Sequence, residues 1–295
     1  MYIKVKPHVK NDLQGYTDLI SLYHQVTKSN ESDIVFDFKN TSWFEANLVA
    51  VLGAIECLAK AKEYKIQRAN ISDKVNDIFK RNGFLEPLPF AHIGNAGTII
   101  SFQQFTPEQA GTFNEYISRE LLSKPDFPNH SPLLGKRIGE SIFEIFENAR
   151  THGKCEYIHT CGQYFPNTSS ARLDMTIVDM GNTIVNNVNS FLTHSNKNAL
   201  LAHDAIEWAI QTGNTTKTDR SGGLGLGLLM DFIRLNKGGV QFVSGEGYLE
   251  FRKGRIRKEI ISEGFPGTIV NMEFNFNDDA FYHLQGEPVL LDNIF

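Results

Sequence analysis

The sequence has few cysteines, no long hydrophobic run and no low-complexity tract. Its three cysteines, Cys57, Cys155 and Cys161, are too few and too irregularly spaced for a disulfide framework. No apolar run is long enough to span a bilayer, and no charged and then apolar secretory leader follows Met1. These absences argue against a disulfide-stapled or membrane-spanning chain, and we expect a cytoplasmic globular protein.

Two of the cysteines share a strand with a histidine. Cys155, His159 and Cys161 have the same parity on an expected strand, which is one arrangement for a metal site. A fourth ligand is not evident nearby, so buried thiols are the alternative interpretation.

Positive charge is not in excess either. The formal net charge is -5, and hydrophobic and charged residues make up 41% and 21% of the chain, as in soluble globular proteins. This balance gives no global reason to expect nucleic acid. One basic run, RKGRIRK at 252–258, could bind an acidic surface or nucleic acid, although a solvated connection between two strands also explains it.

The first hundred residues alternate between strand and helix patterns. Apolar spacing, caps and turn residues predict strands at 2–9, 34–38 and 64–67 and helices at 12–28, 45–59 and 72–83. Ser42 and Glu45 have the spacing of a capping box for the second of these helices. The alternation predicts a small α/β layer structure. In this order the region resembles the STAS family, whose modules antagonise anti-sigma factors and regulate anion transporters.

The stretch 137–153, RIGESIFEIFENARTHG, predicts a helix with two different faces. An apolar stripe recurs at helical spacing, formed by Ile138, Ile142, Ile145, Phe146 and Ala149. Glu144 and Asn148 lie one turn apart and point the same way, so they could hold a metal ion and a water together. Glu140 and Glu147 fit a solvated helix face, which is also the plain alternative for Glu144. Thr151 to Gly153 are expected to form a non-helical exit.

Three further pieces follow in order. A strand at 171–179, expected to bury Leu173, Met175 and Ile177 and to turn Arg172 and Asp174 outward, ends in Asp179-x-Gly181. There a carboxylate can accept a hydrogen bond from a ligand amine. The run 221–227, SGGLGLG, enters a helix at 228–235, and its backbone N–H groups could bind phosphates, or its glycines could serve close helix packing. Gly267-Thr268 opens the last strand with an inward hydroxyl.

Together these pieces resemble the GHKL superfamily, the ATP-binding fold shared by gyrases, sensor histidine kinases and the anti-sigma-factor serine kinases. The ending Asn148-Ala149-x-x-His152-Gly153 is similar to the last branch. The resemblance implies an α+β protein: a small STAS-like α/β domain at 1–100, a two-layer α/β sandwich with a mixed sheet at 101–280, and a tail at 281–295.

The resemblance also implies ATP and Mg²⁺ as cofactors and a role for each motif. Asn148 would hold Mg²⁺ through its amide oxygen. Glu144 would activate the attacking water or protein hydroxyl. Asp179 would bind the adenine amino group, with Gly181 giving room for the base and Thr268 supporting the contact. The phosphates would be wrapped by Gly223, Leu224, Gly225 and Gly227, and a lid at 212–220 would contribute Lys217.

Three functions remain open from the sequence. The first is a regulatory ATPase whose nucleotide state controls a partner protein. The second is a serine/threonine kinase of the anti-sigma-factor type, acting on a STAS-like or other regulatory protein. The third is a nucleotide-binding module with little turnover. A sensor histidine kinase is not expected, because the N-terminal half looks α/β and lacks a dimerisation helix. Expected partners are ATP, a regulated protein and, as one option, a second copy of the chain.

Overall fold

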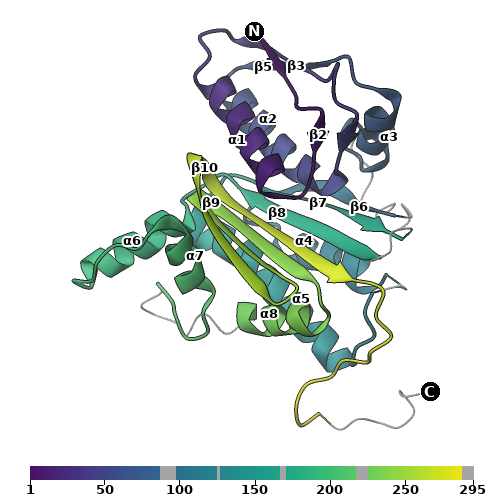
Figure 1. Ribbon diagram of the computed structural model, residues 1–295, viewed down its shortest axis with the longest axis vertical. Helices are drawn as coiled ribbons and strands as arrows, with labels where there is room; N and C mark the ends of the chain where they lie inside the picture. Colours follow the sequence, from purple (N-terminus) through teal and green to yellow (C-terminus); the bar gives the residue numbers. More distant parts are fainter. Residues whose placement is uncertain (87–97, 125–126, 167–170, 217–224, 288–295) are drawn as a thin grey trace.

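The computed structural model describes residues 1–86, 98–124, 127–166, 171–216 and 225–287, which form a mixed α/β protein (Figure 1). A three-stranded sheet, a layer of helices, a five-stranded sheet and a second layer of helices follow one another. Within the described residues, no helix is long and apolar enough to cross a membrane.

The N-terminal part contains a parallel sheet in the order β1-β3-β5 and a short β2-β4 pair. The strands are β1 (Tyr2–Lys4), β2 (His8–Val9), β3 (Asp33–Asp37), β4 (Trp43–Phe44) and β5 (Lys65–Ala69). The helices are α1 (Leu13–Thr27), α2 (Val49–Ala61) and α3 (Asp73–Arg81). The expected strands and helices are present, although the first strand is split in two. Asp12 caps α1, and its side chain accepts from the Gly15 N–H at 2.9 Å.

The expected capping box at Ser42 and Glu45 is wrong. Residues 43 and 44 extend as β4, and a 3-10 turn (Ala46–Leu48) without a side-chain cap leads into α2. The Glu45 carboxylate instead accepts the buried Asn11 N–H at 2.6 Å and lies 3.9 Å from Arg172. Contacts with residues distant in the sequence therefore determine the position of Glu45, and not the local capping-box spacing.

The five-stranded sheet has the order β6-β7-β8-β10-β9. Its strands are β6 (Ile99–Phe105), β7 (Ile158–Phe165), β8 (Arg172–Asp179), β9 (Gly239–Arg252) and β10 (Arg255–Asn275). Every neighbouring pair is antiparallel, so the expectation of a mixed sheet is wrong. After β8 the chain passes through helices and enters β9 in the same direction as β8. However, β10 then inserts between these two strands and pairs antiparallel with both.

Helices of the C-terminal part pack on one face of this sheet. They are α4 (Ala110–Ile117), α5 (Pro132–Asn148), α6 (Ile184–His194), α7 (Ala202–Ile210) and α8 (Gly225–Leu235). A π-helical turn, Ala149–Gly153, extends α5, so the expected non-helical exit at Thr151 to Gly153 is wrong. The chain leaves the helical conformation at Lys154, which is left-handed. The sequence patterns did not predict α6.

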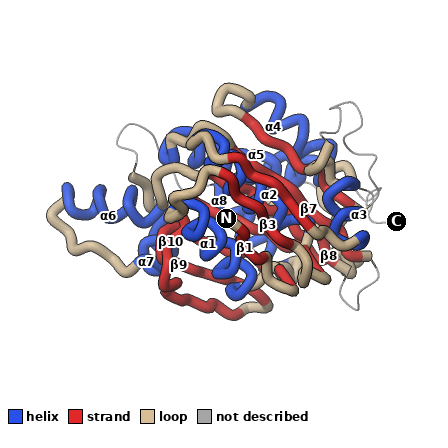
Figure 2. The backbone as a smooth tube through the Cα atoms, turned by 90° about the horizontal axis from the view of Figure 1, so that it is seen from above, coloured by secondary structure: helices blue, strands red, loops and turns tan. Residues whose placement is uncertain are grey.

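The N-terminal helices cover the opposite face of the five-stranded sheet (Figures 1 and 2). Helix α1 lies on β10 and α2 lies on β7 and β8. The N-terminal core therefore includes side chains from the sheet, among them Cys161, Val178 and Phe265. Leu173, Met175 and Ile177 are buried as expected on the other face. Asp174, expected to face outward, is also fully buried because the N-terminal layer covers it.

Candidate functional site

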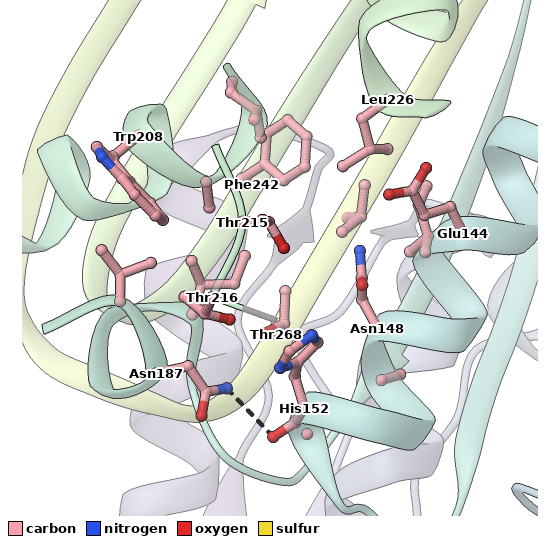
Figure 3. A pocket seen from close by; sticks show the side chains of 18 of the residues that line it. Glu144, Asn148, His152, Asn187, Trp208, Thr215, Thr216, Leu226, Phe242 and Thr268 are labelled. Carbon is pink, nitrogen blue, oxygen red and sulfur yellow. Dashed lines mark hydrogen bonds between the residues drawn. The ribbon is translucent and has the colours of Figure 1, made fainter. Parts of the chain in front are cut away.

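A cavity lies on the helical face of the five-stranded sheet, between α5, α6, α7 and the start of α8 (Figure 3). Its volume is about 930 Å³, including the part open to solvent. Phe242 of β9 and Thr268 and Val270 of β10 form the floor. Apolar side chains combined with a few polar groups around a concave space are typical of small-molecule sites.

One wall of the cavity is the polar side of α5. The apolar stripe of this helix, including Ile138, Ile142 and Phe146, is buried against the sheet. That packing turns Glu144 and Asn148, one turn apart and half-buried, into the cavity. The structure therefore brings together the acid and the amide as their spacing predicts.

Thr268 contributes a hydroxyl from the floor. Its Oγ1 lies 3.0 Å from the Ser244 hydroxyl, which itself donates to the Gly267 carbonyl at 2.8 Å and accepts the Ile184 N–H at 2.8 Å. Because the Ser244 proton is used, Thr268 is placed to donate to Ser244. The lone pairs of the Thr268 oxygen then remain for a donor in the cavity.

Asp179 lies next to Thr268 in the sheet but does not line the cavity. It ends β8 directly opposite Thr268 in the strand register and is buried. Its Oδ1 accepts the Gly181 N–H at 3.1 Å. Burial raises the pKa of the Asp179 carboxyl to about 7, while the Gly181 hydrogen bond lowers it. A Cβ on Gly153, which does line the cavity, would lie 2.9 Å from the Asp179 carboxylate, so only the glycine backbone separates the acid from the cavity.

Gly181 serves the packing of the backbone. A Cβ at this position would overlap the carbonyl oxygen of Gly153, which accepts the Asn182 N–H at 2.6 Å. The glycine is thus required for the π-helical turn to approach the end of β8. The expectation that Gly181 makes room for a ligand base has no counterpart in these contacts, whereas its neighbour Asn182 does line the cavity.

The glycine-rich motif is only partly described. Lys217, Gly223 and Leu224 lie outside the described residues. Gly225 is the first residue of α8, three residues earlier than the expected helix start. Gly227 faces away from the cavity residues, because a Cβ there would lie 2.6 Å from the Thr212 hydroxyl. Close packing therefore explains Gly227, while Leu226 between the two glycines lines the cavity.

Neither a protein-family model nor a curated protein matches this chain.

Several cavity residues were missed in the sequence. Trp208 of α7 and Asn187 of α6 line the wall opposite Glu144 (Figure 3). The Asn187 amide donates to the His152 carbonyl at 3.1 Å, which ties α6 to the end of α5. Thr215 and Thr216 close one side. A signal existed for Trp208, one of two tryptophans in the chain, but Asn187 lies on the helix that the sequence patterns did not predict.

The metal interpretation of Cys155, His159 and Cys161 gains no support. In the described part of the chain, no three His, Cys, Asp or Glu side chains are grouped to hold a metal ion. Cys155 and Cys161 are buried, and burial raises the pKa of both thiols. The alternative interpretation, buried thiols, is confirmed.

Proposed function

We propose that this chain binds Mg-ATP in the cavity and is a regulatory ATPase whose nucleotide state controls a partner protein. The convergence of Glu144, Asn148 and Thr268 on one cavity carries the proposal. These residues come from motifs far apart in the sequence, in the order that the resemblance to GHKL ATPases implies. If Glu144 and Asn148 only formed a solvated helix face, there would be no reason for Thr268 of β10 to line the same cavity.

The residues present fit a magnesium–phosphate group. Mg²⁺ in nucleotide sites takes one or two protein oxygens and completes its shell with phosphates and water. Asn148 would supply its amide oxygen from the α5 wall, close to Glu144 on the same face. When bound, Mg²⁺ would offset the charge of the triphosphate. The first turn of α8 adjoins the cavity at Leu226, so the positive end of this helix favours the same anion.

Glu144 is the proposed general base. It is half-buried and projects into the cavity from a helix whose opposite side is fixed in the core. A carboxylate held in this way can orient a water or hydroxyl and accept its proton. Asn148 cannot accept a proton at neutral pH. Glu144 is therefore the base of the pair, and Asn148 is a neutral ligand.

The opposite part of the cavity fits a planar base. Trp208 offers an aromatic surface, and Phe191 packs against it with ring centroids 5.8 Å apart. Thr268 supplies an acceptor for an exocyclic amine, and the negative charge of the buried Asp179, opposite Thr268 in the strand register, favours the same donor. We assign the adenine to this side and the phosphates to the Glu144 side.

Protein phosphorylation is the alternative reaction at the same site. Ser42 belongs to the N-terminal layer, which covers the sheet face opposite the cavity. Transfer to Ser42 of the same chain is therefore disfavoured by this arrangement. A kinase would act on a hydroxyl of another protein, with Glu144 in the same role.

Nucleotide binding can be measured through Trp208. Trp43 lies in the N-terminal layer beneath Lys74, whose Nζ is 4.3 Å from the ring centroid. The Trp43→Phe variant therefore leaves Trp208 as the only tryptophan, and we expect Mg-ATP to change its fluorescence with saturation. The reciprocal Trp208→Phe variant should give no signal. Absence of binding by calorimetry in the unmodified chain would overturn the proposal.

Turnover separates the reactions. With ATP labelled on the γ-phosphate, free labelled phosphate indicates the ATPase, and labelled protein in a cell extract indicates the kinase. Glu144→Gln should keep nucleotide affinity and lower turnover roughly 10²–10⁴-fold. Wild-type turnover in a folded Glu144→Gln variant would remove the catalytic assignment.

A further inference from the structure

A second cleft lies at the other end of the sheet. It is formed where β8 begins, where β9 and β10 end, and where α8 ends, whereas Asp179 and Thr268 mark the end near the cavity. Its lining contains five cationic side chains and one carboxylate, Glu273. The cations are Arg172, Arg234, Lys237, Arg252 and Lys253. The last two begin the basic run at 252–258, which the nucleotide cavity does not use.

The inner cations are already arranged around an oxyanion. The Glu273 carboxylate lies 2.8 Å from Arg252 Nη2 and 3.6 Å from Arg172 Nε. Arg172 also contacts Asp174 at 3.1 Å. Two guanidinium groups that converge on one carboxylate have the fork geometry that also suits phosphate. The buried floor of the cleft is therefore held in place by ion pairs.

The outer cations are not neutralised to the same extent. Arg234, Lys237 and Lys253 are exposed at the rim. Arg234 is 2.9 Å from Asp231, but among the described residues neither lysine has an ion pair. Burial and then the nearby Glu273 raise the pKa of Asp174, whereas Arg172 lowers it. Glu45 lies 3.9 Å from Arg172 and Glu250 lies 3.6 Å from Arg252, so the surplus positive charge of the cleft rests on Lys237 and Lys253.

We propose that this cleft binds a phosphate monoester dianion, with Lys237 and Lys253 as its principal contacts. A dianion matches the surplus charge better than a single carboxylate, because its charge of about -2 offsets both lysines and its three oxygens can accept from both. A nucleic acid fits less well, since none of the described residues that line the cleft is aromatic and could stack on a base. The phosphate is carried either by a small organic phosphate or by a phosphorylated side chain of a partner protein.

Binding can be tested with two probes on the full chain. Phenyl phosphate and a phosphoserine peptide, beside the unphosphorylated peptide, would be titrated by calorimetry at 50 and 300 mM NaCl. We expect binding of at least one phosphorylated probe that weakens with salt. The double variant Lys237→Ala/Lys253→Ala should weaken it at least about tenfold, because both charge-assisted contacts are lost.

Matched variants separate the cleft from general charge and from the nucleotide cavity. Lys62→Ala/Lys65→Ala removes two exposed lysines of the N-terminal part and should leave the affinity unchanged. Lys237→Arg/Lys253→Arg should retain binding. Equal affinity in the Lys237→Ala/Lys253→Ala variant, or tighter binding of a single-stranded oligonucleotide than of both phosphorylated probes, would overturn the proposal. Stronger binding of the peptide than of phenyl phosphate identifies a protein-borne phosphate, and equal binding identifies a small phosphate. The proposal does not depend on the nucleotide site.

Discussion

Asp179 combines burial with a position beside the cavity. Burial raises its pKa to about 7, so the fraction of Asp179 that carries a negative charge beside Thr268 grows as the pH rises through that value. We expect the affinity for adenosine, which carries no phosphate, to rise between pH 6 and pH 8. The rise should approach tenfold per pH unit below the pKa. Binding titrations at several pH values measure it.

The matched variant is Asp179→Asn. An amide at this position cannot ionise, so adenosine affinity should become independent of pH over the same range. An unchanged pH profile in the folded variant would show that another group controls binding.

His159 is a buried imidazole whose ring nitrogens have no hydrogen-bond partner. Burial lowers its pKa to about 4, from about 6.5 in an unfolded chain. Between pH 4 and pH 6.5, His159 is therefore protonated in the unfolded chain and neutral in the folded chain. The free energy of unfolding should therefore fall as the pH is lowered, by about 1.4 kcal/mol per pH unit for this residue.

Urea unfolding at pH 6.5 and pH 5 tests this effect. His159→Phe, which can pack beside Phe102, should lose about 2 kcal/mol less than the wild type over this interval. His194→Gln, a change at an exposed histidine, serves as control. If His159→Phe and the wild type lose the same amount, His159 is not the group that titrates.

At the scale of elements, the join between α5 and β8 depends on Gly181. Gly181→Ala would drive a methyl group into the Gly153 carbonyl, and we expect a loss of about 1–3 kcal/mol in the free energy of unfolding. Gly111→Ala in α4 has nothing within 4 Å and should be neutral or slightly stabilising. Denaturant titrations compare the two variants. Equal stabilities would show that the π-helical turn shifts easily.

Elements with a strong period were predictable. The apolar stripe of α5 follows from burial on one side of a helix, which a sequence window contains. The alternation in β8 located Leu173, Met175 and Ile177 on one face, although both faces of this strand are buried. The prediction of a capping box at Ser42 was wrong because the Glu45 carboxylate contacts Asn11 and Arg172, which are distant in the sequence. Asp174 was misplaced because a second layer covers its face of the sheet.

The candidate site was predictable where chemistry is local. Glu144 and Asn148 share a helix face by spacing alone. Thr268 was singled out beside Gly267, but the expectation that these residues open the last strand is wrong, because β10 begins at Arg255. Trp208 and Asn187 reach the cavity only because α6 and α7 fold back beside α5. No spacing within the sequence encodes that return. Gly181 and Gly227 were singled out as ligand contacts, whereas the close neighbours that the structure gives them are the protein's own atoms.

At the scale of the whole molecule, a buried polar network joins the N-terminal layer to the five-stranded sheet. The Asn47 amide donates to Thr176 at 3.0 Å and to Asn271 at 3.1 Å. Asn271 in turn donates to Gln241 at 3.1 Å, which also lies 3.2 Å from the Tyr16 hydroxyl. Separating the N-terminal layer from the five-stranded sheet would expose an apolar core and, at the same time, break this network.

We therefore expect the two parts to unfold in one transition. Trp43 reports on the N-terminal layer and Trp208 on the C-terminal part, so the single-tryptophan variants Trp208→Phe and Trp43→Phe follow each separately. Urea midpoints from fluorescence should coincide with the midpoint from circular dichroism in each variant. An earlier transition at Trp43 would instead support an independent unit near residues 1–100.

The central place of β10 has a consequence for biosynthesis. This strand is the last of the sheet to leave the ribosome, yet it lies between β8 and β9, which are both made earlier. Until residue 275 emerges, the flanking strands have unpaired edges, and the N-terminal helices lack part of the surface that they cover. The nascent chain thus passes through a stage exposed to mispairing, and a stop codon ahead of β10 should yield insoluble product.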